Sequence, residues 1–233
     1  MKLTESHIQR LYKFTREHFV YHYDVQTELV DHLANDIEQI WVAQPHLKFE
    51  KARDISFKKF GVFGFMDVVE KKQKAMNKHY RKILWRFTKE WFTMPKIITT
   101  GLIFMLFFIV LQLKHSFLIL GTSFFILAGY DVFLFVKEKI KNKRKEKKQS
   151  EKKWLLKEMI GESRRGFSVI SFINIFNIIN ILDLDFYTLP LFVIAILAFA
   201  ATFTCIIYHV SWAVLPSKAE ELLIEKYPEY SLV

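Results

Sequence analysis

Three side chains able to bind a metal or move a proton are spaced four residues apart: Glu28, His32 and Asp36. On a helix this spacing puts all three on roughly the same side. A neutral imidazole with carboxylates suits zinc or manganese, but such a site wants three or four ligands, and the sequence fixes no further one. We therefore predict no metal and interpret the row as a surface pairing of His32 with Asp36 and Glu28. The sharper alternative is a partner-binding patch, to which Asp31 also belongs.

A second set of polar residues lies inside long apolar stretches: Asn174, Asn177, Asn180, Asp131 and His209. The asparagines recur every three residues and form a polar stripe, which contact with lipid would penalise, so they should face protein or water. Two readings stay open. The stripe makes hydrogen bonds between helices, worth roughly 0.6–2 kcal/mol each, or it lines a path for a solute. Asp131 and His209 lie near the expected cytoplasmic ends and could pair at similar depth.

These residues belong to four apolar segments: 97–113, 116–136, 167–182 and 189–214. A spanning helix needs roughly 20 mostly apolar residues, because the hydrocarbon core is about 30 Å thick and a helix rises 1.5 Å per residue. Four such runs in two closely spaced pairs are not typical of a soluble core. We expect an all-α chain whose residues 97–215 form a four-helix transmembrane bundle, with a short cytosolic tail over 216–233.

The basic residues orient this bundle. The loop over 137–165 carries 13 Lys/Arg against five Glu, and residues 71–89 carry eight Lys/Arg without an acid. The connection on the other face carries one, Lys114. Because short basic loops stay cytoplasmic, both termini should face the cytoplasm, in a multi-pass protein of the cytoplasmic (inner) membrane.

The same basic residues indicate what the loops touch. Contact with anionic lipid headgroups contributes about 1 kcal/mol per basic residue near the surface. Nucleic acid is disfavoured, because the basic run has no interleaved aromatic residues and no recognisable fold around it. The expected headgroup contacts are Lys71, Lys72, Lys141, Lys143, Arg144, Lys145, Lys147 and Lys148.

Residues 1–75 predict a separate cytosolic helical domain. Over residues 1–70, nine Lys/Arg nearly balance 11 Asp/Glu, and the apolar residues recur at helical spacing. A first helix should begin after Thr4 and carry Phe19 on its inner face. A second, capped by Asp24, should run over 25–41 until the Gln44-Pro45-His46 segment stops it.

Two more helices complete this domain and lead to the membrane. The third should cover 49–60 with Ile55 facing inward, and Gly61 should end it in a left-handed conformation. The fourth should run from Met66 and continue as a basic juxtamembrane helix over 76–96. Pro95 marks a bend into the first apolar segment.

Several short motifs of this domain resemble a known family. They are Glu28-Leu29-Val30-Asp31-His32-Leu33, Ile37-Glu38, Phe49-Glu50-Lys51-Ala52 and Phe60-Gly61. In their order they look like the small helical cytoplasmic domain called HAAS, and like the similar permease-prefix domain that precedes some ABC exporter permeases. The resemblance covers about residues 20–75. It departs at 44–48, where a glycine is often expected, and the chain lacks the large extracytoplasmic domain of an exporter permease.

The resemblance implies a signalling or interaction module, often encoded beside PadR-type repressors, and not a catalyst. We therefore expect a protein partner, a transcriptional regulator or a transporter component, besides membrane lipids, and a second copy of the chain is a further candidate. No glycine loop for phosphate, GxSxG elbow or Ser-His-Asp order is present, so we predict neither a catalytic residue nor a cofactor. The favoured function is a regulatory, assembly or signalling accessory. The alternative is a small transporter or transport subunit built on the polar stripe.

Overall fold

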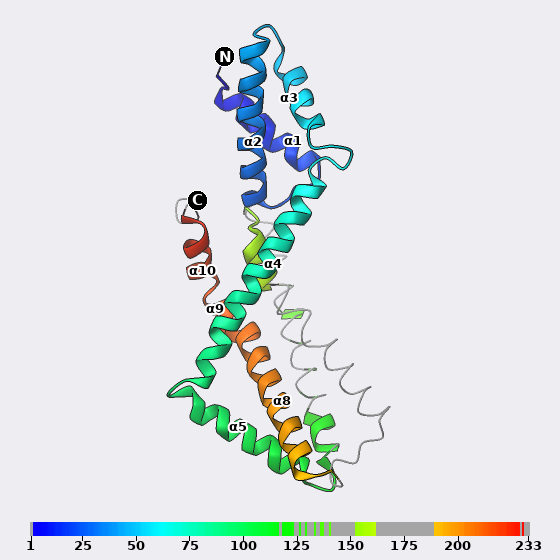
Figure 1. Cartoon of the computed structure of the whole chain (residues 1–233), viewed down its shortest axis with the longest axis vertical. Coiled ribbons are helices and arrows are strands. Elements are labelled where there is room, and N and C mark those ends of the chain that lie inside the picture. Colours follow the sequence, from blue (N-terminus) through cyan, green and yellow to red (C-terminus); the bar gives the residue numbers. More distant parts are fainter. Residues whose placement is uncertain are drawn as a thin grey trace. The chain divides into compact units, whose positions relative to one another are not determined.

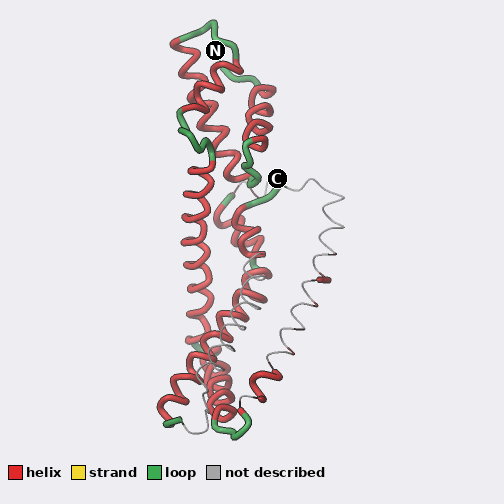
Figure 2. The backbone as a smooth tube through the Cα atoms, turned by 90° about the vertical axis from the view of Figure 1, so that its right-hand side faces the viewer, coloured by secondary structure: helices red, strands yellow, loops and turns green. Residues whose placement is uncertain are grey.

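The computed structural model describes residues 2–116, 118–123, 126, 129, 133, 136–137, 140, 152–161, 189–228 and 230. Within these residues all regular secondary structure is helical and no strand occurs, which confirms the all-α fold class (Figure 2). The chain divides into two compact units: Met1–His79 with Glu151–Glu158, called the head below, and Tyr80–Ser150 with Met159–Val233, called the body. The head thus takes in a short segment that the sequence assigned to the basic loop.

Four helices build the head: α1 (Glu5–Glu17), α2 (Tyr23–Ala43), α3 (Phe49–Lys58) and the beginning of α4 (Met66–Lys89) (Figure 1). Helices α1 and α3 both pack against α2, which supplies more buried apolar residues to the core than any other helix of the head. Its buried apolar residues follow helical spacing: Val25, Leu29, Leu33, Ile37 and Trp41. Full burial of one such side chain contributes about 1.5–3 kcal/mol, so this row is the main source of the head's stability.

The ends of the first two helices follow the sequence signals. Thr4 precedes α1, and its backbone N–H donates to Nδ1 of His7 at 3.3 Å, so a histidine takes the place usually held by glutamate in a capping box. Helix α2 stops at Ala43, with Gln44 as its C-cap. Both predictions are confirmed.

Two predictions of inward-facing residues are wrong. Helix α1 ends at Glu17, so Phe19 lies beyond it with a φ of 64° and is 68% exposed. On α3 the inward row is Phe49, Ala52 and Ser56, and Ile55 is exposed because it falls off that row. The apolar periodicity predicted both helices correctly. It was wrong about which residues face inward near the end of each one.

The turn between α3 and α4 depends on two glycines. Gly61 and Gly64 have φ values of 82° and 55°, in the left-handed region that other residues adopt only with strain. This confirms the left-handed conformation predicted at Gly61. At Gly64 a Cβ atom would also lie 2.9 Å from the ring of Phe57, whereas at Gly61 it would meet nothing. The chain therefore passes close to Phe57 only because position 64 has no side chain.

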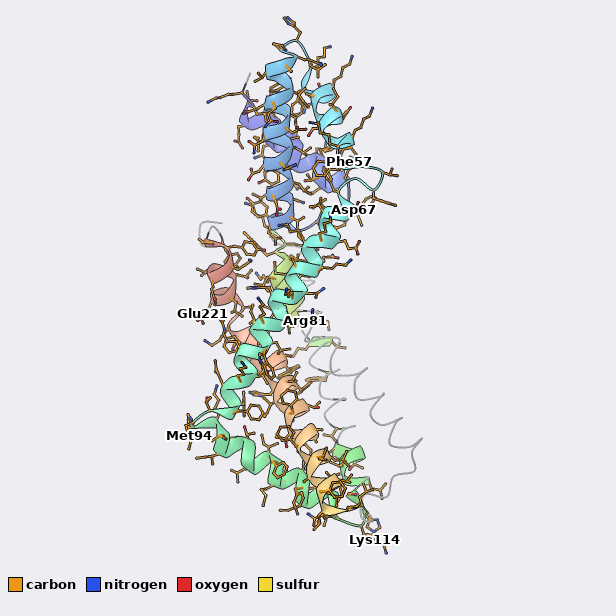
Figure 3. The ribbon with its side chains drawn as sticks, viewed as in Figure 1. Phe57, Asp67, Arg81, Met94, Lys114 and Glu221 are labelled. Carbon is orange, nitrogen blue, oxygen red and sulfur yellow. The ribbon has the colours of Figure 1, made fainter. Side chains whose placement is uncertain are left out.

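Helix α4 continues to Lys89, followed by a short 3-10 turn, η1 (Glu90–Phe92), and then by α5 (Lys96–Leu111). The two helical stretches are bent by 85° at the break between them. Figure 3 shows Met94 at this bend and Lys114 beyond the far end of α5. The bend predicted at Pro95 is confirmed.

In the body, α5 packs against α8 (Leu191–His209). Leu111 of α5 meets Ile194 and Ala198 of α8 in a small apolar cluster. The outward faces of both helices remain apolar and exposed: Ile98, Leu102, Met105, Leu106 and Ile109 on α5, and Leu191, Phe192, Ile196 and Phe199 on α8. A contiguous apolar surface of this kind is typical of contact with lipid or with another protein.

Among the described helices, one is long and apolar enough to cross a membrane: the 27 residues of Leu191–Ser217. Helix α5 has 16 residues, which is about 24 Å at 1.5 Å per residue, and passes the same test only together with α4 as a bent pair. The predicted segments 97–113 and 189–214 are thus largely helical. Segment 116–136 is described only in part, and 167–182 lies outside the described residues.

Helix α8 changes its winding near its end. A π-helical stretch, η3 (Val210–Val214), follows His209 and leads into α9 (Leu215–Ser217) and α10 (Ala219–Lys226). Pro216 has no amide hydrogen, and its ring crowds the carbonyl four residues earlier. The wider π turn lies directly before this proline and gives it room, so the helical path continues through it.

Candidate partner-binding surface of the head

The row of Glu28, His32 and Asp36 lies on α2 as predicted, and two of its members form ion pairs within the head. Nζ of Lys72 on α4 lies 2.5 Å from Oε2 of Glu28, and Nζ of Lys59 lies 2.5 Å from Oδ1 of Asp36. Both carboxylates thus bind lysines of segments that follow α2 in sequence, whereas the sequence predicted His32 as their partner. Lys72, predicted to contact lipid headgroups, is engaged in one of these pairs.

Asp36 is the more enclosed carboxylate of the row. Burial raises its pKa, but the hydrogen bond that Lys59 donates and the charge of Lys59 outweigh this, so the pKa of Asp36 lies below its ordinary value of 3.8. The side chain of Asp36 is 17% exposed. Since its negative charge is stabilised only in the folded head, Asp36 contributes to holding the end of α3 against α2.

The other two residues of the predicted patch stay on the surface. His32 is exposed, and its ring meets Phe60 edge-on at 5.8 Å between centroids. Asp31 is exposed as well. In the part of the chain that the structure describes, no group of three or more His, Cys, Asp or Glu side chains is placed to hold a metal ion.

Three exposed apolar residues of the head are sequence neighbours of residues that lie against Phe57, and the sequence did not predict their exposure. We name them the apolar edge: Phe19, Val62 and Phe63. Val62 is 98% and Phe63 72% exposed. Both precede Gly64, which lies against the ring of Phe57, and His18, next to Phe19, packs on the same ring at 4.5 Å. The signal in the sequence was the run Gly61-Val62-Phe63-Gly64. Its two apolar residues stand between glycines in a turn, where they have no place in the core.

A second contact of the head was also missed. Residues 152–158, named the strap, lie against the beginning of α2, more than 120 residues earlier in the chain. The N–H of Tyr23 donates to the carbonyl of Lys153 at 2.7 Å, and the ring of Trp154 meets that of Tyr23 at 5.4 Å. Asp24, predicted to cap α2, instead accepts the N–H of Leu155, while His22 is the N-cap residue of α2.

Of the polar residues predicted within the membrane, the structure describes His209. Its ring lies edge-on to Trp91 at 5.2 Å, and nearby Phe203 of α8 meets Trp85 and Phe92. Outside the described residues lie Asp131, Asn174, Asn177 and Asn180, and with them the predicted pairing of Asp131 with His209.

The predicted headgroup contacts divide in the same way. Lys71 is exposed on α4. Lys72 is described as well and pairs with Glu28. The other six lie outside the described residues: Lys141, Lys143, Arg144, Lys145, Lys147 and Lys148. In the described part of the body, Arg86 of α4 donates two hydrogen bonds of 3.2 Å to Glu225 of α10, and this pair raises the pKa of Arg86. A basic residue of α4 thus binds α10.

Comparison of the chain with models of known families, with curated proteins and with solved structures finds no match. The likeness of residues 20–75 to the HAAS domain therefore stays a prediction from the motifs alone.

Proposed function

We propose that this protein is a small multi-pass membrane protein whose head binds another protein in a regulatory or assembly role. The apolar edge carries this proposal. The head already has a complete core of its own, so Val62 and Phe63 are not needed to fill it, and yet they are held outward by a turn with two left-handed glycines. Apolar side chains fixed in water by a rigid scaffold are typical of a surface that another protein covers.

The membrane part of the proposal is supported by the body. Helices α5 and α8 bury a small apolar cluster between them and expose large apolar side chains on their other faces. Leu191–Ser217 also has the length of a span. We propose four spans, at 97–113, 116–136, 167–182 and 189–214, with both termini and the loop 137–165 in the cytoplasm. The excess of Lys and Arg beside the membrane supports this orientation.

A photo-crosslinking amino acid at position 63 of the full-length protein, expressed in its native membrane, tests the head's role. We expect a discrete protein adduct at Phe63 and none at Val42, an equally accessible control that is 80% exposed at the far end of α2. Absence of a protein adduct at position 63, or the same adduct at both positions, contradicts partner binding through the apolar edge. Adducts to lipid alone would assign this edge to the membrane surface instead.

Cysteine accessibility tests the orientation. In a Cys205→Ser background, single cysteines at His115 and Tyr187 should react with an impermeant maleimide added from outside, and a cysteine at Gln149 should react only after permeabilisation. Labelling of Gln149→Cys from outside would overturn the orientation and the cytoplasmic placement of the head.

A further inference from the structure

We propose that the first turn of α2 is a docking site for the chain's own basic loop, and that the strap is its occupant. The loop between the second and third predicted spans would then be fastened to the head. The inference concerns an intramolecular contact and goes beyond the partner-binding role of the apolar edge.

Three consecutive residues, His22, Tyr23 and Asp24, each hold the strap by a different interaction. Nε2 of His22 lies 2.8 Å from Oε2 of Glu158, and the N–H of Tyr23 donates to the carbonyl of Lys153. Oδ1 of Asp24 accepts the N–H of Leu155 at 3.2 Å. The contact thus involves the backbone of both segments as well as side chains of the head, which makes it specific.

These bonds satisfy the ends of two helices at once. A helix leaves its first N–H groups without partners and carries a partial positive charge at that end. Tyr23 begins α2, and Leu155 begins the short helix over 155–161. The strap's carbonyl satisfies a donor of α2, the carboxylate of Asp24 satisfies a donor of the strap, and the charge of Asp24 lies between both positive ends. Each helix start therefore supplies a hydrogen-bond acceptor for a backbone N–H of the other.

Apolar burial adds the second half of the site. Trp154 is 3% exposed, and Leu155 and Leu156 are buried too, although they stand in a loop otherwise rich in lysine. Tyr23, against which Trp154 packs, is stacked on Tyr12 with centroids 5.9 Å apart, so the ring is held in place from the head side. A buried apolar triplet is not typical of a solvated linker, and its first member, Trp154, packs on Tyr23 within the site.

Lys152 of the strap adds a further contact with Tyr23 through its ammonium group. It lies 4.1 Å from the centre of the Tyr23 ring, within the range of a cation–π interaction. Burial raises the pKa of Tyr23, but Lys152 and the neighbouring hydroxyls outweigh it and lower that pKa below its ordinary value of 10. The occupant that fits this site is therefore a helix start carrying a lysine and a tryptophan, which is what the strap provides.

Hydrogen–deuterium exchange on the full-length protein in lipid nanodiscs tests the contact. We expect the amides of 155–158 to be protected, and Trp154→Ala and Asp24→Ala each to speed their exchange at least tenfold. Exchange in 29–37 of α2 should stay unchanged in Trp154→Ala, which separates release of the strap from unfolding of the head. The matched control is Trp85→Ala, a tryptophan outside the site. Unprotected 155–158 amides in the wild type, or no effect of Trp154→Ala, would overturn the proposal.

A cysteine pair then identifies the occupant. In the Cys205→Ser background, His22→Cys with Glu158→Cys should be joined within one chain by a short bismaleimide. Val42→Cys with Glu158→Cys should not, because 20 residues of helix place position 42 about 30 Å from position 22. A covalent dimer in place of the internal link would mean that a second copy supplies the strap and would overturn an intramolecular latch. Neither result depends on cross-linking at Phe63, so the two proposals fail separately.

Discussion

Helices α2 and α8 are similar in length, with 21 and 19 residues, but they distribute their side chains in opposite ways. In α2 the large apolar residues face inward, and charged residues such as Glu28 and Asp36 reach lysines of neighbouring segments. In α8 the buried row includes the small residues Ala198 and Thr202, while Phe192, Ile196 and Phe199 are exposed.

The difference agrees with the proposal that α2 packs in water and α8 in lipid. Water drives apolar surface inward, and this is what orders α2. Between helices in lipid that driving force is absent, so small residues that allow close backbone approach face the neighbour and large ones face the acyl chains. The hydroxyl of Thr202 also fits this environment, because it donates to the carbonyl of Ala198 within its own helix at 2.8 Å. On the proposed placement, the head and the body are therefore ordered by different forces.

The largest effect should come from the core of the head. Leu33→Ala removes a fully buried side chain and should lower the head's free energy of unfolding by about 2–5 kcal/mol. Hydrogen exchange of the most protected α2 amides in the full-length protein measures this. Leu102→Ala, on the outer face of α5, is the control and should leave those amides unchanged. A loss below about 1 kcal/mol for Leu33→Ala would mean that α2 is not the centre of an independent core.

Two exposed isoleucines, one on each unit, test whether the head faces water and the body faces lipid. Ile196→Lys on α8 should cost about 2.5–3.5 kcal/mol of membrane insertion, because the ammonium must leave water. Ile55→Lys on α3 should change stability by no more than about 0.5 kcal/mol, since Ile55 is exposed on the head. An insertion assay with engineered glycosylation sites measures the first, and thermal unfolding the second. Equal tolerance of lysine at both positions would remove the distinction between head and body.

The two left-handed glycines give a smaller, graded effect within the head. Gly61→Ala should lower stability by about 1 kcal/mol through backbone strain alone. Gly64→Ala carries the same strain and also forces the ring of Phe57 to move, because the new Cβ would lie 2.9 Å from it. We expect Gly64→Ala to be the more damaging of the two in thermal denaturation. The reverse order would show that Phe57 moves freely and that the close approach contributes nothing.

The smallest effect should appear as a dependence on pH. The pKa of Asp36 is lower in the folded head than its ordinary value of 3.8, so its contribution to stability is present above that value and is lost as the pH falls through the folded pKa. Asp36→Asn should therefore flatten the acid side of the head's stability curve, and Lys59→Gln should do the same by removing the partner. Glu50 and Glu70, whose pKa values are also lowered by Arg10 and Lys74, preserve the remaining slope.

Denaturation midpoints between pH 2.5 and 7 compare these variants with the wild type. An unchanged acid slope in both variants would show that the Lys59–Asp36 pair does not hold α3 to α2.

The sequence predicted what depends on neighbours along the chain. The starts of α1 and α4, the end of α2, the left-handed Gly61 and the bend at Pro95 all follow from caps, glycines and prolines within a few residues. Helical periodicity also predicted α2 itself, because its apolar row is long enough to define a helix. On α3, with ten residues, the phase was too weakly defined, and Ile55 was placed inward wrongly.

The contacts that the sequence missed join residues far apart. Asp24 precedes an apolar row and so has the pattern of a cap for its own helix, yet its carboxylate binds a helix start 131 residues later. Nothing near Glu28 indicates that Lys72 would pair with it. Such pairings depend on the tertiary fold, whereas capping and periodicity are local, and the same limit applies to the apolar edge, whose exposure depends on which residues the core excludes.

The separation of Asp24 from the strap has a consequence for biosynthesis. At about 5–20 residues per second, the 131 residues between Asp24 and Leu155 take roughly 7–26 s to make. During that time the ribosome produces both members of the first pair of apolar segments. Tyr23 and Asp24 meanwhile lack the strap residues that they bind in the folded protein. Domains generally fold as units with the amino-terminal one first, so the head would collapse early and close its last contact only when the nascent chain delivers Trp154.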